Sequence, residues 1–273
     1  MISLSDAFYV GGTNLMQMLN YPALFGIIGS FICALALNQP TTAHAAGNVH
    51  LQVQNGDLIL TGDNQDNNII VIQECCQTVV VNGRADTTVN GSSGRVDADG
   101  VTGDIIIAMN EGKDFVRVEI TPGVAVIARN LRINTGSGDD TVELFGVTVR
   151  GNTQIHTDEG DDVILIDGVR TPNGYKRPDF KDSFSVGAGS GDDLLEFHNA
   201  VFRGTVDVKM GSGIDGVCST EDSEFLQPNL AFFDGGLPNG FPGDGFVAPI
   251  LELPHITNFE DFPDDCSYLG GRD

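Results

Sequence analysis

The chain carries little positive charge. Its 273 residues include 14 Lys and Arg against 38 Asp and Glu, which gives a formal net charge of −24 at pH 7. A charge of this sign and size repels phosphate backbones and anionic membrane surfaces, and it attracts cations. We therefore expect no nucleic-acid partner.

Tryptophan is absent, and no stretch shows a sustained heptad or a long amphipathic helical pattern. These absences disfavour a helical bundle. Glycine, by contrast, occurs 35 times, and 41% of the residues are hydrophobic, so the chain is long enough to bury a real core. The expected fold class is all-β.

The N-terminal segment differs from the rest of the chain. No Lys or Arg precedes Arg84, and the run from Tyr21 to Leu37 is almost purely apolar. Ala43-His44-Ala45 has the small-x-small form that signal peptidase accepts, so we expect residues 1–45 to be a signal peptide that is cleaved after Ala45. An uncleaved membrane anchor is the alternative, but the run is short, contains one proline and two glycines, and lacks flanking positive charge.

Cleavage there predicts a secreted protein, extracellular or at the cell surface, with no stable membrane insertion. Four cysteines remain in the mature chain: Cys75, Cys76, Cys218 and Cys266. An even number in an exported chain predicts two disulfides, for which three connectivities are open. The adjacent pair is not expected to bond to itself, and no zinc-type spacing is present.

One sequence unit recurs along the chain. Four segments are versions of a single glycine- and aspartate-rich turn: 136–140 (Gly-Ser-Gly-Asp-Asp), 159–162 (Glu-Gly-Asp-Asp), 189–193 (Gly-Ser-Gly-Asp-Asp) and 211–215 (Gly-Ser-Gly-Ile-Asp). Their final aspartates are 22, 31 and 22 residues apart, so the longer interval is one unit plus a nine-residue insertion. A fixed period of this size indicates a solenoid.

Apolar residues align in columns on both sides of these turns. The columns are Leu131, Thr153, Phe184 and Val206; Ile133, Ile155, Val186 and Val208; Val142, Ile164, Leu195 and Val217; and Leu144, Ile166 and Phe197, with Ser219 breaking the last. Their spacing of two residues predicts a strand, a turn and a second strand in each unit. The same template fits at Asp114 and Asn67, whereas residues 75–103 do not fit it.

These columns predict a right-handed parallel β-helix, or β-solenoid, with about six or seven coils. A third short strand near residues 147–149 and 201–202 completes each coil. We expect the solenoid to span residues 46–219, with the insertion at 170–179 as a loop and residues 220–273 as an irregular C-terminal cap, because the pattern stops near Thr220.

The turns place aspartates in two columns along the solenoid. One holds Asp139, Asp161 and Asp192, and the other holds Asp140, Asp162, Asp193 and Asp215. Neighbouring coils lie about 4.8 Å apart, so each like-charge contact costs on the order of 1 kcal/mol in water. Calcium held by these carboxylates and by turn carbonyls relieves that repulsion. The alternative is that the aspartates form turns and accept hydrogen bonds from nearby N–H groups.

Over residues 105–217 the Gly-Ser-Gly-Asp-Asp turns, followed by alternating apolar residues, resemble the calcium-binding repeats of repeats-in-toxin (RTX) and hemolysin-type extracellular proteins. The resemblance implies calcium held between Gly-x-Gly-x-Asp turns and folding triggered by calcium after export. The family repeat has nine residues and two turns per coil, whereas one turn appears in this sequence per 22 residues. Calcium sites paired across two sides of a roll therefore do not carry over.

Enzymatic and adhesive functions are the other classes. A polysaccharide lyase or hydrolase of the parallel β-helix type needs acids and a basic residue on one face. Arg150, Lys181 and Arg203 form a column half a coil from the aspartates, and we expect them to pair with neighbouring acids such as Asp182 or Asp207. No Gly-x-Ser-x-Gly, His-Glu-x-x-His, phosphate-loop or dinucleotide motif occurs in the sequence.

A structural or adhesive role needs no chemistry. If the protein has such a role, the insertion, which carries Arg170, Tyr175, Lys176 and Arg177 on an otherwise acidic body, is the expected contact point for a cell-surface glycan or protein. An ordinary surface loop is the alternative, and the sequence favours it.

Overall fold

The computed structural model describes residues 47–75, 77–120, 129–172, 174–219, 223–238, 245–247 and 255–259. The predicted signal peptide lies outside them. In this described part of the chain, no helix is both long and apolar enough to cross a membrane.

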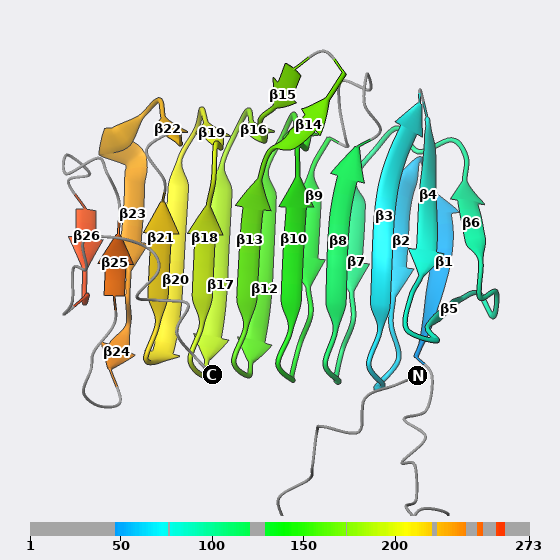
Figure 1. Ribbon diagram of the computed structural model, residues 1–273, viewed down its shortest axis with the longest axis horizontal. Helices are drawn as coiled ribbons and strands as arrows, with labels where there is room; N and C mark the ends of the chain where they lie inside the picture. The colour runs from blue at the N-terminus through cyan, green and yellow to red at the C-terminus, as the bar shows by residue number, and fades with distance from the viewer. Residues whose placement is uncertain are drawn as a thin grey trace, which may run out of the picture. The chain divides into compact units, whose positions relative to one another are not determined.

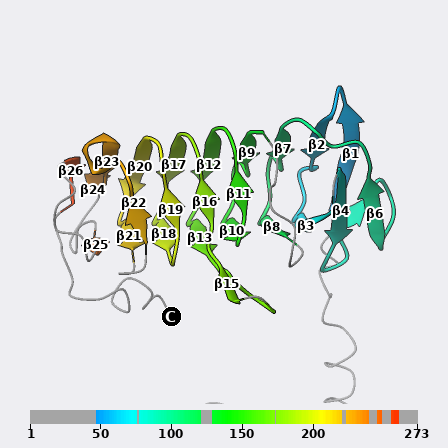
Figure 2. The same cartoon turned by 90° about the horizontal axis from the view of Figure 1, so that it is seen from above.

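The described residues form a parallel β-solenoid, so the predicted all-β class is confirmed (Figure 1). Successive coils contribute strands to three sheets, which Figure 2 shows from above. Among the described residues, two elements lie outside these three sheets: a separate two-stranded sheet, β14 (Val169–Thr171) and β15 (Gly174–Lys176), and a 3₁₀ turn, η2 (Pro228–Leu230).

In sheets 1 and 2 the strands are named from the C-terminal to the N-terminal end of the solenoid. Sheet 1 consists of β26 (His255–Thr257), β23 (Ala231–Asp234), β20 (Val206–Gly213), β17 (Phe184–Ser190), β12 (Thr153–Glu159), β9 (Leu131–Asn134), β7 (Ile105–Ala108), β2 (Asp57–Thr61), β1 (Asn48–Gln54) and β5 (Thr88–Val89), with β24 (Leu237–Pro238) beside β20. Sheet 2 consists of β25 (Gly245–Val247), β21 (Gly216–Ser219), β18 (Leu194–Phe197), β13 (Val163–Asp167), β10 (Thr141–Phe145), β8 (Phe115–Ile120), β3 (Asn68–Cys75), β4 (Thr78–Gly83) and β6 (Arg95–Ala98). Sheet 3, whose path runs the other way, consists of β11 (Thr148–Val149), β16 (Asp179–Phe180), β19 (Val201–Phe202) and β22 (Glu224–Phe225).

The registers confirm the predicted columns. In sheet 1, Ile133, Ile155, Val186 and Val208 are neighbours on successive coils, and in sheet 2 the same holds for Val142, Ile164, Leu195 and Val217. All of these side chains are buried. The two further coils at Asn67 and Asp114 are also confirmed, because β2 pairs with β7 and β3 with β8 in the predicted register.

Phenylalanine fills the core of the later coils. Phe180, Phe202 and Phe225 form a stack on sheet 3, with centroids 5.2 Å and 4.9 Å apart and nearly parallel rings. Phe184 and Phe197 meet Phe202 edge-on from the other two sheets. Aromatic rings therefore join the three sheets at this end of the solenoid.

The residues at 75–103 that fit no column form the N-terminal end of the solenoid. Strand β4 runs antiparallel to β3, and β6 runs antiparallel to β4, while β1 runs antiparallel to β2. This stretch lacks the Gly-Asp turn, so the chain reverses instead of advancing by one coil. The 47-residue interval between Asn67 and Asp114 therefore builds an end cap and adds no coil between those two.

Parallel pairing continues past the predicted boundary at residue 219. Strands β22, β23 and β25 pair in parallel with β19, β20 and β21, and β26 pairs with β23. The described parts of 220–273 thus form further coils, where we expected an irregular cap. Paired residues on successive coils are 25 residues apart from Val206 to Ala231 and 29 residues apart from Gly216 to Gly245. Because these coils are longer than the 22-residue unit, the sequence repeat did not reveal them.

Cys218 is buried on β21. Cys76 and Cys266 lie outside the described residues, as does the side chain of Cys75. The predicted disulfide pairing therefore stays a prediction.

Candidate functional site

Each Gly-Asp-Asp turn uses two left-handed residues. They stand four and two positions before the final aspartate of the turn. The first position is taken by Asn110 (φ 82°), Gly136 (99°), Asp158 (65°), Gly189 (120°) and Gly211 (113°), and the second by Gly112 (123°), Gly138 (133°), Gly160 (134°), Gly191 (132°) and Gly213 (156°). Asn and Asp are the non-glycine residues that best tolerate this conformation, which explains why one turn starts with aspartate in place of glycine.

The second position also needs glycine because the coils approach closely there. A Cβ atom on Gly191 would lie 2.0 Å from the carbonyl oxygen of Gly160, and one on Gly213 would lie 1.8 Å from that of Gly191. No side chain fits at these distances. The Gly-x-Gly-x-Asp pattern is therefore a consequence of stacking one turn on the next.

The final residues of the turns form the inner column: Asn67, Asp114, Asp140, Asp162, Asp193 and Asp215. Each of the first five donates its backbone N–H to the Oδ1 atom of the aspartate on the next coil, over 2.7–2.9 Å. The aspartates of this column are at most 2% exposed. One carboxylate oxygen per coil thus satisfies a turn N–H that the β-ladder does not reach.

The preceding residues form the outer column: Asp66, Lys113, Asp139, Asp161, Asp192 and Ile214. In this column the donor lies on the later coil. The N–H groups of Asp161, Asp192 and Ile214 donate to Oδ1 of Asp139, Asp161 and Asp192 over 3.2, 2.8 and 2.8 Å. Asp139 and Asp161 are exposed, and the ammonium of Lys113 lies 3.8 Å from Asp139.

Burial changes the acid–base behaviour of the inner column. Together with a smaller contribution from the neighbouring inner carboxylates, it raises the pKa of Asp114 and Asp162 to about 7 and that of Asp193 to about 8. It also raises the pKa of Asp140. The Oδ2 atoms of these four residues are buried without a hydrogen-bond partner, which is costly for a charged carboxylate.

The seven aspartates predicted to bind calcium therefore divide into two sets. Asp140, Asp162, Asp193 and Asp215 lie in the buried inner column, whereas Asp139, Asp161 and Asp192 lie in the outer column at the surface. Within the described residues, no group of three or more His, Cys, Asp or Glu side chains is arranged to hold a metal ion. The carboxylates that remain accessible to cations are those of the outer column.

The registers of sheet 3 pair Val149 with Phe180 and Phe180 with Phe202, so the residues that follow them stand at the same place on successive coils and form the predicted cation column of Arg150, Lys181 and Arg203. Its acid partner is Asp179, where we expected Asp182 or Asp207. Arg203 Nε lies 2.7 Å from Asp179 Oδ1, and Lys181 pairs with the same carboxylate. Burial opposes the charge of Asp179, but the two cations hold its pKa below the usual value.

The predicted insertion loop is a β-hairpin, β14 (Val169–Thr171) and β15 (Gly174–Lys176), that leaves the solenoid after β13. Two glycines of the coils accommodate it. A Cβ atom on Gly146 would lie 2.5 Å from the side chain of Val169, and one on Gly168 would lie 2.2 Å from the ring of Tyr175. The hairpin emerges at the opposite end of β13 from Asp162, so one strand length separates it from the aspartate columns.

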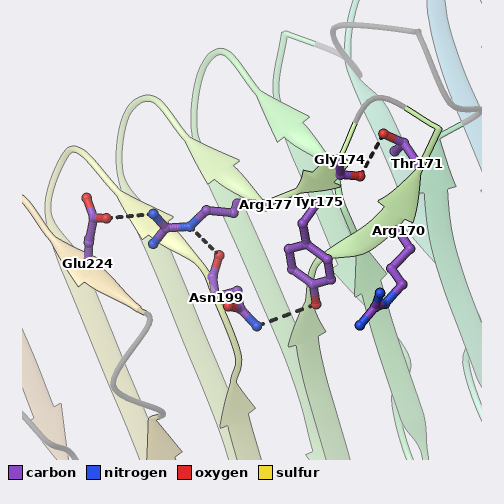
Figure 3. A pocket seen from close by; sticks show the side chains of 7 residues that line it. All are labelled: Arg170, Thr171, Gly174, Tyr175, Arg177, Asn199 and Glu224. Atoms are coloured by element: carbon purple, nitrogen blue, oxygen red, sulfur yellow. Dashed lines mark hydrogen bonds and ion pairs between the residues drawn. The ribbon is translucent and has the colours of Figure 1, made fainter.

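A pocket of about 830 Å³ lies at this hairpin (Figure 3). Its lining consists of Arg170, Thr171, Gly174, Tyr175, Arg177, Asn199 and Glu224. The residues come from the hairpin, from the end of β18 and from β22, so three coils contribute to it. The pocket thus contains three of the four insertion residues that the sequence singled out.

Sequence reasoning missed Asn199 and Glu224. Arg177 Nη1 pairs with Glu224 Oε1 at 2.6 Å, and Arg177 Nε donates to the carbonyl of Asn199 at 2.9 Å. Asn199 lies 22 residues from Arg177 and Glu224 lies 47 residues from it. Neither carries a motif, and the coil register is the one signal that relates them to the hairpin.

No family model, curated protein or solved structure matches this chain.

We predict that Gly191→Ala destabilises the solenoid by about 2–4 kcal/mol, because the new Cβ adds a clash with the Gly160 carbonyl to the strain of positive φ. Gly174→Ala is the matched control, since its φ is also positive at 119° but nothing lies within 4 Å. Chemical denaturation of both variants gives the comparison. Equal losses would show that the close stacking of turns contributes nothing beyond backbone strain.

We also predict that the solenoid is more stable at mildly acidic than at alkaline pH. The folded-state pKa values of Asp162 and Asp193, about 7 and 8, exceed the ordinary value, so the folded chain binds protons more tightly. This stabilisation is complete below about pH 4 and is lost as pH rises through 7 to 8. Thermal melts from pH 4 to 9 should show a fall in Tm of about 5 °C or more across that upper range.

The double variant Asp162→Asn/Asp193→Asn keeps the Oδ1 atoms that accept the backbone N–H groups, and it removes two ionisable carboxyl groups. Asparagine is compatible with this column, because Asn67 occupies it on the first coil. The Tm of the variant should depend less on pH than that of the wild type. An unchanged slope would mean that the inner column does not cause the pH dependence.

Proposed function

We propose that this protein is a secreted, acidic β-solenoid with a structural or adhesive role outside the cell, and that it contacts its partner at the pocket of the β14–β15 hairpin. The partner class is a cell-surface glycan or protein. The observation that carries the proposal is that the hairpin interrupts a regular repeat without taking part in stacking.

The register defines the interruption. Phe145 aligns with Asp167, and Thr148 aligns with Asp179. Two residues lie between Phe145 and Thr148 on one coil, whereas eleven lie between the equivalent residues, Asp167 and Asp179, on the next coil. The nine extra residues, 169–177, are therefore an insertion into the coil. The hairpin strands pair with each other, whereas the coil strands on either side pair with neighbouring coils.

Charge supports the same place. The chain has a net charge of −24, yet the pocket lining carries two arginines and one glutamate. Surface hairpins and loops on a rigid scaffold commonly carry binding residues. A cationic pocket on an acidic solenoid attracts an anionic partner to one place and in one orientation, which the rest of the coil surface does not do.

Deletion of residues 169–177 tests this proposal. It joins Gly168 to Pro178, as Gly146 joins Val147 one coil earlier, so we expect an unchanged circular dichroism spectrum and a Tm within a few degrees of the wild type. The full chain and the variant are passed over a panel of immobilised neutral polysaccharides, acidic polysaccharides and extracellular-matrix proteins. The wild type should bind at least one surface and the variant should not.

An exposed residue outside the pocket provides the control for this panel: Arg150→Gln should bind as the wild type does. If the hairpin-deleted variant binds equally well, or if the wild type binds no surface, the proposed contact site is wrong.

As a second candidate function, we propose that the outer column binds calcium. Its support is that Asp139 and Asp161 are exposed on adjacent coils and accept one N–H each, so like charges face each other at the surface. Calcium bound by one or two carboxylates retains water in its coordination shell, and it reduces this repulsion without entering the core.

We predict that millimolar calcium raises the Tm relative to EDTA by several degrees, while magnesium does so less, because binding to the folded chain stabilises it. Asp139→Asn/Asp161→Asn should abolish the difference. Asp182→Asn/Asp207→Asn removes the same charge away from the column and should keep it. A Tm that is equal in calcium and EDTA would argue that the outer aspartates only form turns.

A further inference from the structure

The geometry of the pocket points to its ligand class: we infer that it binds a saccharide unit that carries a carboxylate group. Arg170 would bind the carboxylate, and the ring of Tyr175 would lie against the sugar. This inference rests on the proposed function, because it specifies the partner at the hairpin.

Arg170 supplies the cation. Its side chain is exposed, and within the described residues it has no hydrogen bond or ion pair. Arg170 is the cross-strand neighbour of Tyr175, and Figure 3 shows the two side chains side by side. A guanidinium binds a carboxylate through two parallel hydrogen bonds, which a neutral sugar cannot match.

Arg177 has a different role. It is held by Glu224 at 2.6 Å and by the carbonyls of Asn199 and Ala200 at 2.9 and 3.4 Å. Its charge is offset by Glu224, and its contacts tie the hairpin to the two following coils. Of the two arginines in the lining, Arg170 is therefore the one available to an anion.

Tyr175 offers a flat, fixed surface. Its hydroxyl donates to Asp167 Oδ1 at 2.7 Å, and its ring lies over Gly168, where a Cβ atom would be 2.2 Å away. The residue nevertheless stays 46% exposed. One side of the ring is thus packed on the coil while the rest is open to a ligand, as an amphipathic aromatic residue at a binding site requires.

Asp167 holds the Tyr175 side of the pocket in place. Its Oδ1 atom accepts from the Tyr175 hydroxyl and also from the backbone N–H of Gly168 at 2.6 Å. The Asn199 amide lies 3.4 Å from both this oxygen and the Tyr175 hydroxyl, at the long limit of a hydrogen bond. That amide is therefore free to shift toward a sugar hydroxyl at little cost.

The shape and lining favour a sugar over a peptide. A volume of about 830 Å³ suits a ligand of one or two sugar units. The lining offers hydroxyl, amide and guanidinium groups with one aromatic ring, and it contains no aliphatic side chain that would bind an apolar peptide residue. A carboxylate adds the charge that Arg170 recognises.

The test uses the galacturonate disaccharide and its dimethyl ester, which has the same sugar units without the charge. Titration calorimetry of the full chain at low salt should give at least about tenfold weaker binding for the ester. Arg170→Gln should weaken binding of the acid to the level of the ester, and Tyr175→Ala should weaken both ligands. Arg150→Gln, an exposed arginine outside the pocket, should change neither, and an unchanged Tm shows that each variant is folded.

Equal affinity for acid and ester, or an unchanged affinity in Arg170→Gln, would overturn the inference. It would also be overturned if no uronate bound while the hairpin deletion still abolished binding to another surface of the panel. In that case the proposed function would stand with a different ligand. If the hairpin deletion had no effect on binding to any surface, the proposed function itself would fail.

Discussion

In a parallel solenoid, each residue lies about 4.8 Å from the residue at the same position of the next coil. The residue type at each position therefore depends mainly on whether that side chain can stack on the side chain at the same position of the next coil. Apolar residues such as Ile133 and Ile155 do so without cost and bury each other. Gly160 and Gly191 do so because they have no Cβ to meet the carbonyl of the coil before. The core and the turns follow from the same constraint.

Aspartate is the residue for which this constraint is most demanding, because stacked carboxylates repel each other. The inner column meets it by giving each Oδ1 a backbone N–H from the previous coil, as between Asp140 and Asp162. The other oxygen remains buried without a partner, and burial favours the protonated form. The outer column keeps its carboxylates at the surface, where water or cations screen them. Two adjacent aspartates in one turn thus experience opposite environments.

The hairpin is where this chain departs from the constraint. Residues 169–177 have no counterpart on the neighbouring coils, so their side chains are not selected for stacking. They carry the arginines and the tyrosine, while the coil contributes Asn199 and Glu224 to the same pocket. A rigid repeat with one irregular insertion separates the part of the molecule that provides stability from the part that is available for recognition.

The Gly-x-Gly-x-Asp pattern was informative about the position of the turns and less so about their chemistry. The sequence predicted where the Gly-x-Gly-x-Asp turns lie and that their aspartates align. It left open whether the aspartates bind calcium or accept hydrogen bonds from N–H groups, and it did not predict that Asp140 and its counterparts form the buried column, because both columns have the same residue type. Which carboxylate points inward depends on the backbone conformation of the turn, with left-handed residues at two defined positions.

The sequence by itself determined the repeat, the strand registers and the place of the insertion, because each follows from a period that can be counted along the chain. It did not determine the end cap at residues 75–103 or the coils beyond residue 219, since the period is lost or lengthened there. Tertiary structure alone decided the pocket and the ion pairs. Arg177 and Glu224 are 47 residues apart, and only the stacking of coils brings them together.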